Sequence, residues 1–349
     1  GKARRLRKQH QQLVQLLEHA QLVLGKLTGR SLLMTQYLLK RGGQSLVLLL
    51  LVSLIGFGIL YLSPGGPLSQ LAQSSNLAQE DIDRLTRSMG LDRPFLIQYG
   101  DWLLRMVRGD WGASYRDGIG VLATIGSHIG ATLSLMAVST VIAALLGGMI
   151  GIWGAVRRHS LMDALSSVGA MIALSIPTFW FGLMAIYLFS IKLGWLPAGN
   201  QQTFGDGSFL DLAHHMIAPV MVLALVETAV WARFMRSSMI ETLEQDYIRT
   251  ARAKGAGGRA IILSHALRNA LLPMITLVGL QFPTLLGGAL ITETVFSWPG
   301  MGRLFFDSLE YRDYPVVMGI LMLSAIMVML GSLLADVLYA IADPRIRMD

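Results

Sequence analysis

The sequence predicts an all-α integral membrane protein with about six transmembrane helices, and three observations support this. Of the 349 residues, 53% are hydrophobic and only 15% are charged, whereas soluble domains average about 25% charged residues. Long windows that are nearly free of charge alternate with charged connections, as a bilayer requires. Lys and Arg are also distributed unevenly among those connections, which is typical of membrane proteins.

Six windows are long enough to cross the hydrocarbon core as helices: Gln44–Leu62, Leu122–Val156, Asp163–Ile191, Leu212–Met235, Ala270–Thr292 and Pro315–Ile341. A large segment, residues 63–121, separates the first two and contains a predicted short helix at Gln79–Met89. Prolines in or at the ends of spans free backbone carbonyls and can bend helices: Pro177, Pro219, Pro273 and Pro283.

Gly147 and Gly151 give the second span a face of small residues. Such a face permits close helix packing in a membrane. Both a moving interface and an ordinary static contact fit this pattern, so the two interpretations stay open.

The charge distribution predicts the orientation. With the N-terminus inside, twenty of the 29 Lys and Arg residues fall on the cytoplasmic side and nine on the outer side. Positive charge accumulates in cytoplasmic loops, so both termini are expected in the cytoplasm and residues 63–121 outside. The net charge of +7 is then explained by these loops, and nucleic acid is not expected as a partner.

The N-terminal extension, residues 1–33, is basic and amphipathic, with apolar residues at helical spacing. It is too polar to span a bilayer. It could lie on the inner membrane surface through its Lys and Arg residues. It could equally be a remnant of cloning or of a start placed too early, because Met34 begins a more ordinary membrane-protein N-terminus.

The cytoplasmic connection, residues 236–269, is the most informative segment. A helix is predicted up to Lys254, a sharp turn at Gly255, and a second amphipathic piece from Arg259 to Asn269. A compact helix–glycine–helix projection between two spans can transmit force to a soluble partner. A plain solvated loop fits the same residues, so the pattern alone leaves both interpretations open.

The run DYIRTARAKG at Asp246–Gly255, followed by HALRNALLP at His265–Pro273, resembles the cytoplasmic EAA loop of ABC importer permeases. The version is that of the dipeptide, oligopeptide and nickel family. The resemblance implies that the loop couples the chain to an ATPase through these residues: Asp246, Tyr247, Arg249, Thr250, Ala251, Lys254 and Gly255.

Other segments resemble the same family. The run ETVFSWPGMG at Glu293–Gly302 is similar to its periplasmic signature loop, which assigns that role to Glu293, Phe296, Pro299, Gly300 and Gly302. Residues 62–67 are similar to the family's APGDP, with Gly66 in place of the usual Asp, and residues 342–345 also fit. The resemblance covers residues 34–349.

The family implies a type I-like permease fold in the bacterial inner membrane that works by alternating access. The large segment after the first span is similar to that of the B-type subunit. Implied partners are a second, related permease in a heterodimer, two cytoplasmic ATPases that bind ATP and Mg²⁺, and a periplasmic substrate-binding protein. No cofactor is expected in this chain itself.

Catalytic chemistry is not predicted. The absence of cysteine excludes disulfides, thiolate metal sites and cysteine nucleophiles, and the seven histidines lack metal-ligand spacing. Neither Gly-Lys pair, at residues 1–2 and 25–26, is followed by Ser or Thr, so no phosphate-binding loop is present. No catalytic or metal-binding residue is therefore assigned.

Glu227 is the notable charged residue within a span, about two turns from the predicted inner end. Intramembrane carboxylates are costly and usually functional. Glu227 could line the translocation pathway, pair with Arg233 or simply meet water at the inner mouth. Asp163 and Asp336 lie near span ends, where capping or anchoring is expected.

Two other functional classes remain as alternatives to the importer. A secondary transporter would need intramembrane ion sites, for which Glu227 is the candidate, and a membrane scaffold would not need the coupling projection. The substrate is left open among dipeptides, oligopeptides, glutathione, nickel complexes and peptide-like antibiotics, since selectivity in this family lies largely in the binding protein.

Overall fold

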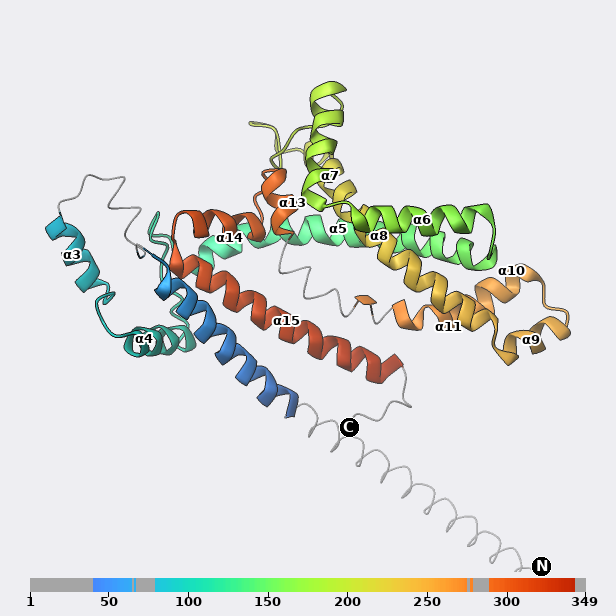
Figure 1. Ribbon diagram of the computed structural model, residues 1–349, viewed down its shortest axis with the longest axis horizontal. Coiled ribbons are helices and arrows are strands. Elements are labelled where there is room, and N and C mark those ends of the chain that lie inside the picture. The colour runs from blue at the N-terminus through green and yellow to red at the C-terminus, as the bar shows by residue number, and fades with distance from the viewer. Residues whose placement is uncertain (1–39, 65, 67–78, 275–276, 279–288, 343–349) are drawn as a thin grey trace, which may run out of the picture. The chain divides into compact units, whose positions relative to one another are not determined.

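The computed structural model describes residues 40–64, 66, 79–274, 277–278 and 289–342 (Figure 1). Two compact units are distinguished: residues 1–50 with 340–349, and residues 51–339. The described part of the first unit is helical. The second unit carries every site discussed below, and its described secondary structure is helical apart from one isolated bridge between Ala113 and Gly120.

Four helices are long and apolar enough to cross a membrane: Lys40–Leu62, α5 (Val121–Val156), α8 (Phe209–Leu243) and α15 (Tyr314–Ala342), the last over Tyr314–Leu334. α5 and α15 begin within one residue of the predicted windows. The predicted span at Ala270–Thr292 lies largely outside the described residues, as does the N-terminal extension at residues 1–33. The expected count of six spans therefore stays a prediction, because the described residues do not include all of the predicted windows.

The predicted span at Asp163–Ile191 is bent. It consists of α6 (Leu161–Ser175) and α7 (Thr178–Ala185) with its π-helical continuation Ile186–Lys192, and these two parts meet at 97°. Pro177 explains the break. It has no N–H to donate to the preceding turn, and it forces the residue before it out of the helical region. Ile176 accordingly has φ −81° and ψ 125°.

α5 and α8 form the central pair of the second unit. A Cβ on Gly147 would lie 2.5 Å from Cβ of Trp231, and one on Gly151 would lie 2.7 Å from the carbonyl oxygen of Ala232. Both glycines are thus required by the close approach of the two backbones. From Gly147 to Gly151 along α5, the contacted residue moves from Trp231 to Ala232 along α8. Residue numbers thus increase together on both helices, so α5 and α8 run in the same direction.

The segment between the first span and α5 contains α3 (Gln79–Ser88) and α4 (Phe95–Val107). α3 matches the short helix predicted at 79–89. α4 packs against residues 51–62 of the first helix through an aromatic cluster, which comprises Phe57, Tyr61, Phe95, Tyr99 and Trp102.

The loop after α4 is fixed to the start of α15 by one carboxylate. Asp313 is buried and accepts a hydrogen bond from the Ser114 hydroxyl at 2.5 Å and one from the Tyr115 backbone N–H at 3.0 Å. Burial raises the pKa of the Tyr115 phenol above its ordinary value of 10.0. The segment is therefore folded where it joins α5 and α15.

Candidate functional site

The predicted coupling segment forms α9 (Asp246–Ala253), directly after α8 ends. Figure 1 shows α9 and α10 (Gly258–Ala260) beyond one end of α8, and α13 and α14 toward the other end of the unit. Only Ile248 of α9 is fully buried, while most of the predicted coupling residues are exposed: Asp246, Tyr247, Arg249, Thr250, Lys254 and Gly255. Ala251 is half-buried. α9 therefore exposes a mainly polar surface and is held to the rest of the unit by one fully buried apolar side chain, that of Ile248.

The anchor of α9 belongs to the main apolar cluster of the unit. Ile248 has no exposed surface and shares that cluster with Met239 of α8 and with Ile261 and Ala266 from the segment after the turn. The Asn269 amide donates a hydrogen bond to the Tyr247 hydroxyl at 2.7 Å. The runs Asp246–Gly255 and His265–Pro273 thus pack on each other, and the projection is a folded unit rather than a solvated loop.

Gly255 ends α9 with φ +83°, as the predicted glycine turn requires. Its N–H donates to the Arg252 carbonyl, and the N–H of Ala256 reaches back to the Ala251 carbonyl. These hydrogen bonds satisfy the last carbonyl groups of the helix, and they require a left-handed conformation at residue 255 that glycine adopts without steric cost. The direction in which the chain leaves α9 is set at this residue.

A bidentate ion pair joins α6 to α8 close to the coupling segment. Nε of Arg236 donates to Oδ1 of Asp163 at 2.6 Å, and the Arg236 NH2 group donates to Oδ2 at 2.9 Å. Asp163 is buried, and the Ser160 hydroxyl, at the N-cap of α6, accepts from the Asp163 backbone N–H. Of the two expected roles of Asp163, anchoring is therefore found and the N-cap is Ser160, but the anchoring partner 73 residues away was not foreseen.

A second ion pair runs beside the first. Arg158, in the turn between α5 and α6, donates to Glu244 at 2.9 Å, immediately after the end of α8. Both groups are largely exposed, so this pair contributes little stability by itself. Together, the two pairs link the start of α6 to the end of α8 that leads into α9.

The predicted outer signature loop closes around Glu293, which has no exposed surface. Glu293 lies in α13 (Leu290–Val295), and its carboxylate accepts from the backbone N–H groups of Gly302 and Arg303 at 2.7 and 3.1 Å. These N–H groups belong to the first turn of α14 (Met301–Glu310), where negative charge is favoured. Glu293 is therefore an internal cap of α14.

α5 completes this outer cluster. The Thr132 hydroxyl donates to Glu293 at 2.8 Å and accepts from the Met301 N–H at 2.7 Å, while the Trp298 indole donates to the Ala131 carbonyl at 2.9 Å. A Cβ on Gly302 would lie 2.5 Å from Cα of Leu290. Of the remaining predicted loop residues, Phe296 and Gly300 are buried and Pro299 is half-buried.

Glu227 lies near the middle of α8, because this helix continues two turns past the predicted boundary at Met235. Its predicted position, two turns from the inner end of the span, stays a prediction. The atom Oε2 is buried and has no hydrogen-bond partner among the described residues, and the suggested pairing with Arg233 is not formed. The helix thus carries at mid-length a carboxyl group with one unpartnered oxygen, beside the Thr140 hydroxyl.

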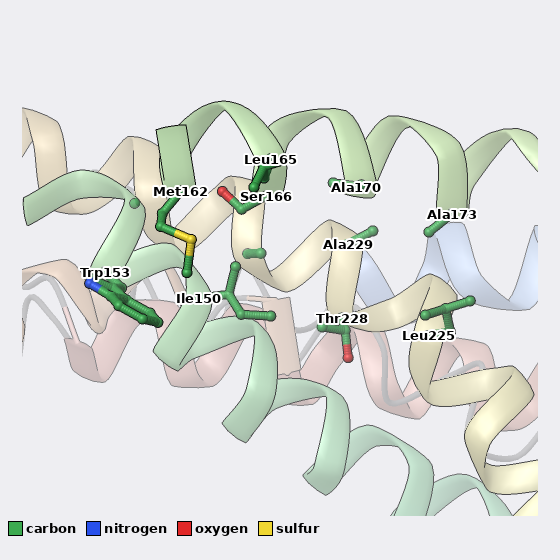
Figure 2. Close-up of a pocket in the computed structure, with 13 residues that line it drawn as sticks. Ile150, Trp153, Met162, Leu165, Ser166, Ala170, Ala173, Leu225, Thr228 and Ala229 are labelled. Atoms are coloured by element: carbon green, nitrogen blue, oxygen red, sulfur yellow. The ribbon is translucent and has the colours of Figure 1, made fainter. Parts of the chain in front are cut away.

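A cavity of about 470 Å³ lies between α5, α6 and α8. Figure 2 shows Ala170 and Ala173 of α6 across from Ala229 and Leu225 of α8, with Trp153, Ile150 and Met162 at one end. The lining is almost entirely apolar. A charged or zwitterionic solute would lose its hydration there without compensation, so this cavity is not where we place the translocation pathway.

These features define a polytopic helical membrane protein with a folded projection at one end and a closed polar cluster at the other. Residues 147–348 match the family described as binding-protein-dependent transport system inner membrane component, and residues 34–136 match its N-terminal membrane component. The chain belongs to this family and is a permease subunit of an ABC importer.

Relatives along nearly the full length agree. The oligopeptide transport system permease protein AppB of Bacillus subtilis is 42% identical over 315 residues, covering 90% of this chain and 99% of that protein. The dipeptide transport system permease protein DppB of Escherichia coli K12 is 38% identical over 336 residues, covering 90% and 99%. Their resemblance was expected from the motifs.

A solved structure of the MetNI methionine ABC transporter in an inward-facing conformation is similar in fold. Its TM-score is 0.51 at 19% identity, covering 64% of this chain and 97% of that chain. At this identity the likeness shows the fold alone. It agrees with the predicted ABC importer permease architecture.

Proposed function

We propose that the chain is the B-type permease subunit of an importer for peptides or peptide-like solutes, powered by separate ATPases that hold ATP and Mg²⁺. The single observation that carries this is α9: an exposed polar helix, anchored by Ile248 and closed by Gly255, at the end of the longest apolar pair of helices. The full-length relatives named for dipeptide and oligopeptide transport support the substrate class.

The proposed assembly contains a second, related permease, two ATPases and a periplasmic substrate-binding protein. Six spans, both termini in the cytoplasm and a periplasmic segment at residues 63–121 complete the proposal. The twenty-to-nine distribution of Lys and Arg supports this orientation. So does the position of the α9 projection and the Glu293 cluster near opposite ends of the α5–α8 pair.

Movement of the ATPases would reach the membrane through a short rigid path. α9 would receive the contact, α8 is continuous with its base, and the Asp163–Arg236 pair joins α8 to α6. α6 leads to the 97° bend at Pro177. A rigid-body change between two states, as in other switching proteins, would use this path.

Exchanging the two charges tests the path. Asp163→Asn should lower the stability of the purified complex by about 2–3 kcal/mol, since it leaves Arg236 half-buried and without its ionic partner. The variant should also reduce peptide-stimulated ATP turnover. The double variant Asp163→Arg with Arg236→Asp restores an ion pair with the charges reversed. It should therefore be more stable, and have faster peptide-stimulated ATP turnover, than Asp163→Arg or Arg236→Asp alone. Thermal unfolding and ATPase assays measure the two effects.

Arg158→Ala is the matched control, because its pair with Glu244 is exposed and should contribute less than about 1 kcal/mol. If Asp163→Asn behaves like Arg158→Ala in both assays, the buried pair is not part of the transmission path.

Purification tests the proposed assembly. A tag on the chain should recover two ATPase subunits and a second permease in fixed ratio from detergent-solubilised membranes. A secondary transporter or a scaffold would be recovered without ATPases, and that outcome would contradict the importer.

A further inference from the structure

Buried polar atoms without partners gather in one place in the middle of the molecule. Among the described residues, six side-chain polar atoms are buried and have no hydrogen-bond partner. Three of them belong to residues on facing parts of α5 and α8: the Thr140 hydroxyl, Oε2 of Glu227 and the Trp231 indole N–H. A fourth, the Thr228 hydroxyl, belongs to a residue that lines the apolar cavity described above. Trp231 is 3% exposed and shares an apolar cluster with Ala143 of α5 and Ala224 of α8. We call Thr140, Glu227 and Trp231 the mid-helix polar cluster.

The register of the two helices brings these groups together. Trp231 contacts α5 at Gly147, where a Cβ would lie 2.5 Å from Cβ of Trp231. Because α5 and α8 run in the same direction, Thr140 lies two turns earlier on α5, and its hydroxyl neighbours the Glu227 carboxyl. The cluster is therefore contributed by both helices.

Its depth in the membrane gives the cluster its significance. Thr140 and Glu227 each lie near the midpoint of a helix of 36 and 35 residues, respectively. Buried polar groups are normally paired, and an intramembrane carboxyl is retained for a function. Substrate sites of membrane transporters also lie commonly near the bilayer midplane. The unmet hydrogen-bonding capacity therefore indicates a ligand rather than a packing role.

The chemistry of the cluster indicates which part of a ligand would bind there. The Glu227 carboxylate is complemented by a cationic donor, the Thr140 hydroxyl can donate or accept, and the indole N–H can only donate. The α-ammonium of a peptide, together with its first carbonyl oxygen, supplies the complementary set in adjacent atoms. A purely anionic or apolar solute would leave the carboxylate unpaired.

We propose that the mid-helix polar cluster is a transient subsite on the translocation pathway that receives the free amino terminus of the transported peptide. The proposal rests on the proposed function and adds to it the chemical group that is recognised and the residues that recognise it. Glu227 would accept from the ammonium group, Trp231 would donate to the adjacent carbonyl, and Thr140 would satisfy the remaining position.

Thiol accessibility tests the site directly, because the chain has no cysteine and any introduced cysteine is unique in it. In the assembled complex, Thr140→Cys should react with a cationic methanethiosulfonate reagent in at least one nucleotide state. Leu145→Cys is the control on the same helix, at a side chain that is 62% exposed on an apolar face, and it should react at least tenfold more slowly. Mass spectrometry of this chain measures both rates.

The ligand is probed with dialanine and N-acetyl-dialanine, which differ in the cationic amino terminus. Millimolar dialanine should slow labelling of Thr140→Cys at least threefold, and N-acetyl-dialanine should not. If Thr140→Cys reacts as slowly as Leu145→Cys in every nucleotide state, or if both peptides protect equally, the subsite is contradicted.

Transport by Glu227 variants separates this proposal from the function on which it rests. ATP-driven uptake of dialanine should fall at least tenfold in Glu227→Gln and should be partly retained in Glu227→Asp, at equal amounts of complex in the membrane. Unchanged uptake in Glu227→Gln would overturn the subsite and leave the importer intact. Failure of the unaltered complex to import any peptide would instead overturn the proposed function.

Discussion

Gly255→Val is expected to abolish peptide uptake while leaving the chain in the membrane. Gly255 has φ +83°, where a β-branched residue is strained by about 1–3 kcal/mol. The strain should be relieved by opening the turn after α9, which would tilt the exposed face of the helix away from its ATPase contact. Uptake should be lost, and ATP hydrolysis should become slow or insensitive to the loaded binding protein.

Gly257→Val is the matched control. Gly257 lies two residues away with φ −68° and ψ 152°, and a Cβ added there meets nothing within 4 Å. The same side chain is therefore tolerated, and uptake should stay near that of the unaltered complex. Equal loss in both variants would show that valine in this turn acts through bulk or expression rather than through the left-handed conformation.

Ala251→Trp should give the same loss by a different route. Ala251 is half-buried at the end of α9, and a large side chain would not fit a close contact with an ATPase. Membrane abundance must be measured alongside uptake. Normal abundance with normal, substrate-stimulated ATP turnover would show that α9 is not the coupling element.

Glu293→Ala is expected to be the most destabilising single change at the outer end. It removes the acceptor for the buried N–H group of Gly302, the half-buried N–H group of Arg303 and the buried Thr132 hydroxyl. Each buried donor left unpaired costs about 1–3 kcal/mol, so a loss of about 3 kcal/mol or more is expected. Thermal unfolding of the detergent-purified chain measures it.

Glu80→Ala removes the same atoms at an exposed position, where the side chain is 87% accessible. It should change stability by no more than about 0.5 kcal/mol. A Glu293→Ala variant as stable as Glu80→Ala would contradict the role of Glu293 as the internal cap of α14.

Much of the helical architecture could be predicted because hydrophobic length and glycine have direct physical consequences. The window at Leu122–Val156 differs from α5 by one residue, and the predicted left-handed turn is found at Gly255. α8 continues two turns past the predicted span boundary at Met235, into the segment predicted as cytoplasmic. Arg236 lies in this continuation, where its charge is neutralised by Asp163.

The contacts that organise the two ends could not be predicted from one sequence. Asp163 and Arg236 are 73 residues apart, and Thr132 and Glu293 are 161 apart, so no local pattern relates them. Glu293 was expected in an outer signature loop, yet it is fully buried. Only the folded chain shows that its carboxylate satisfies the first turn of α14.

ATP-driven uptake in proteoliposomes tests the central claim most directly. The chain is reconstituted with its second permease, two ATPases and the binding protein, and uptake of labelled dialanine is followed with ATP supplied on the ATPase side. The account predicts uptake that requires ATP, the binding protein and an intact Gly255, and that persists when ion gradients are collapsed. Uptake by the chain alone, driven by a proton or sodium gradient without ATP, would contradict it.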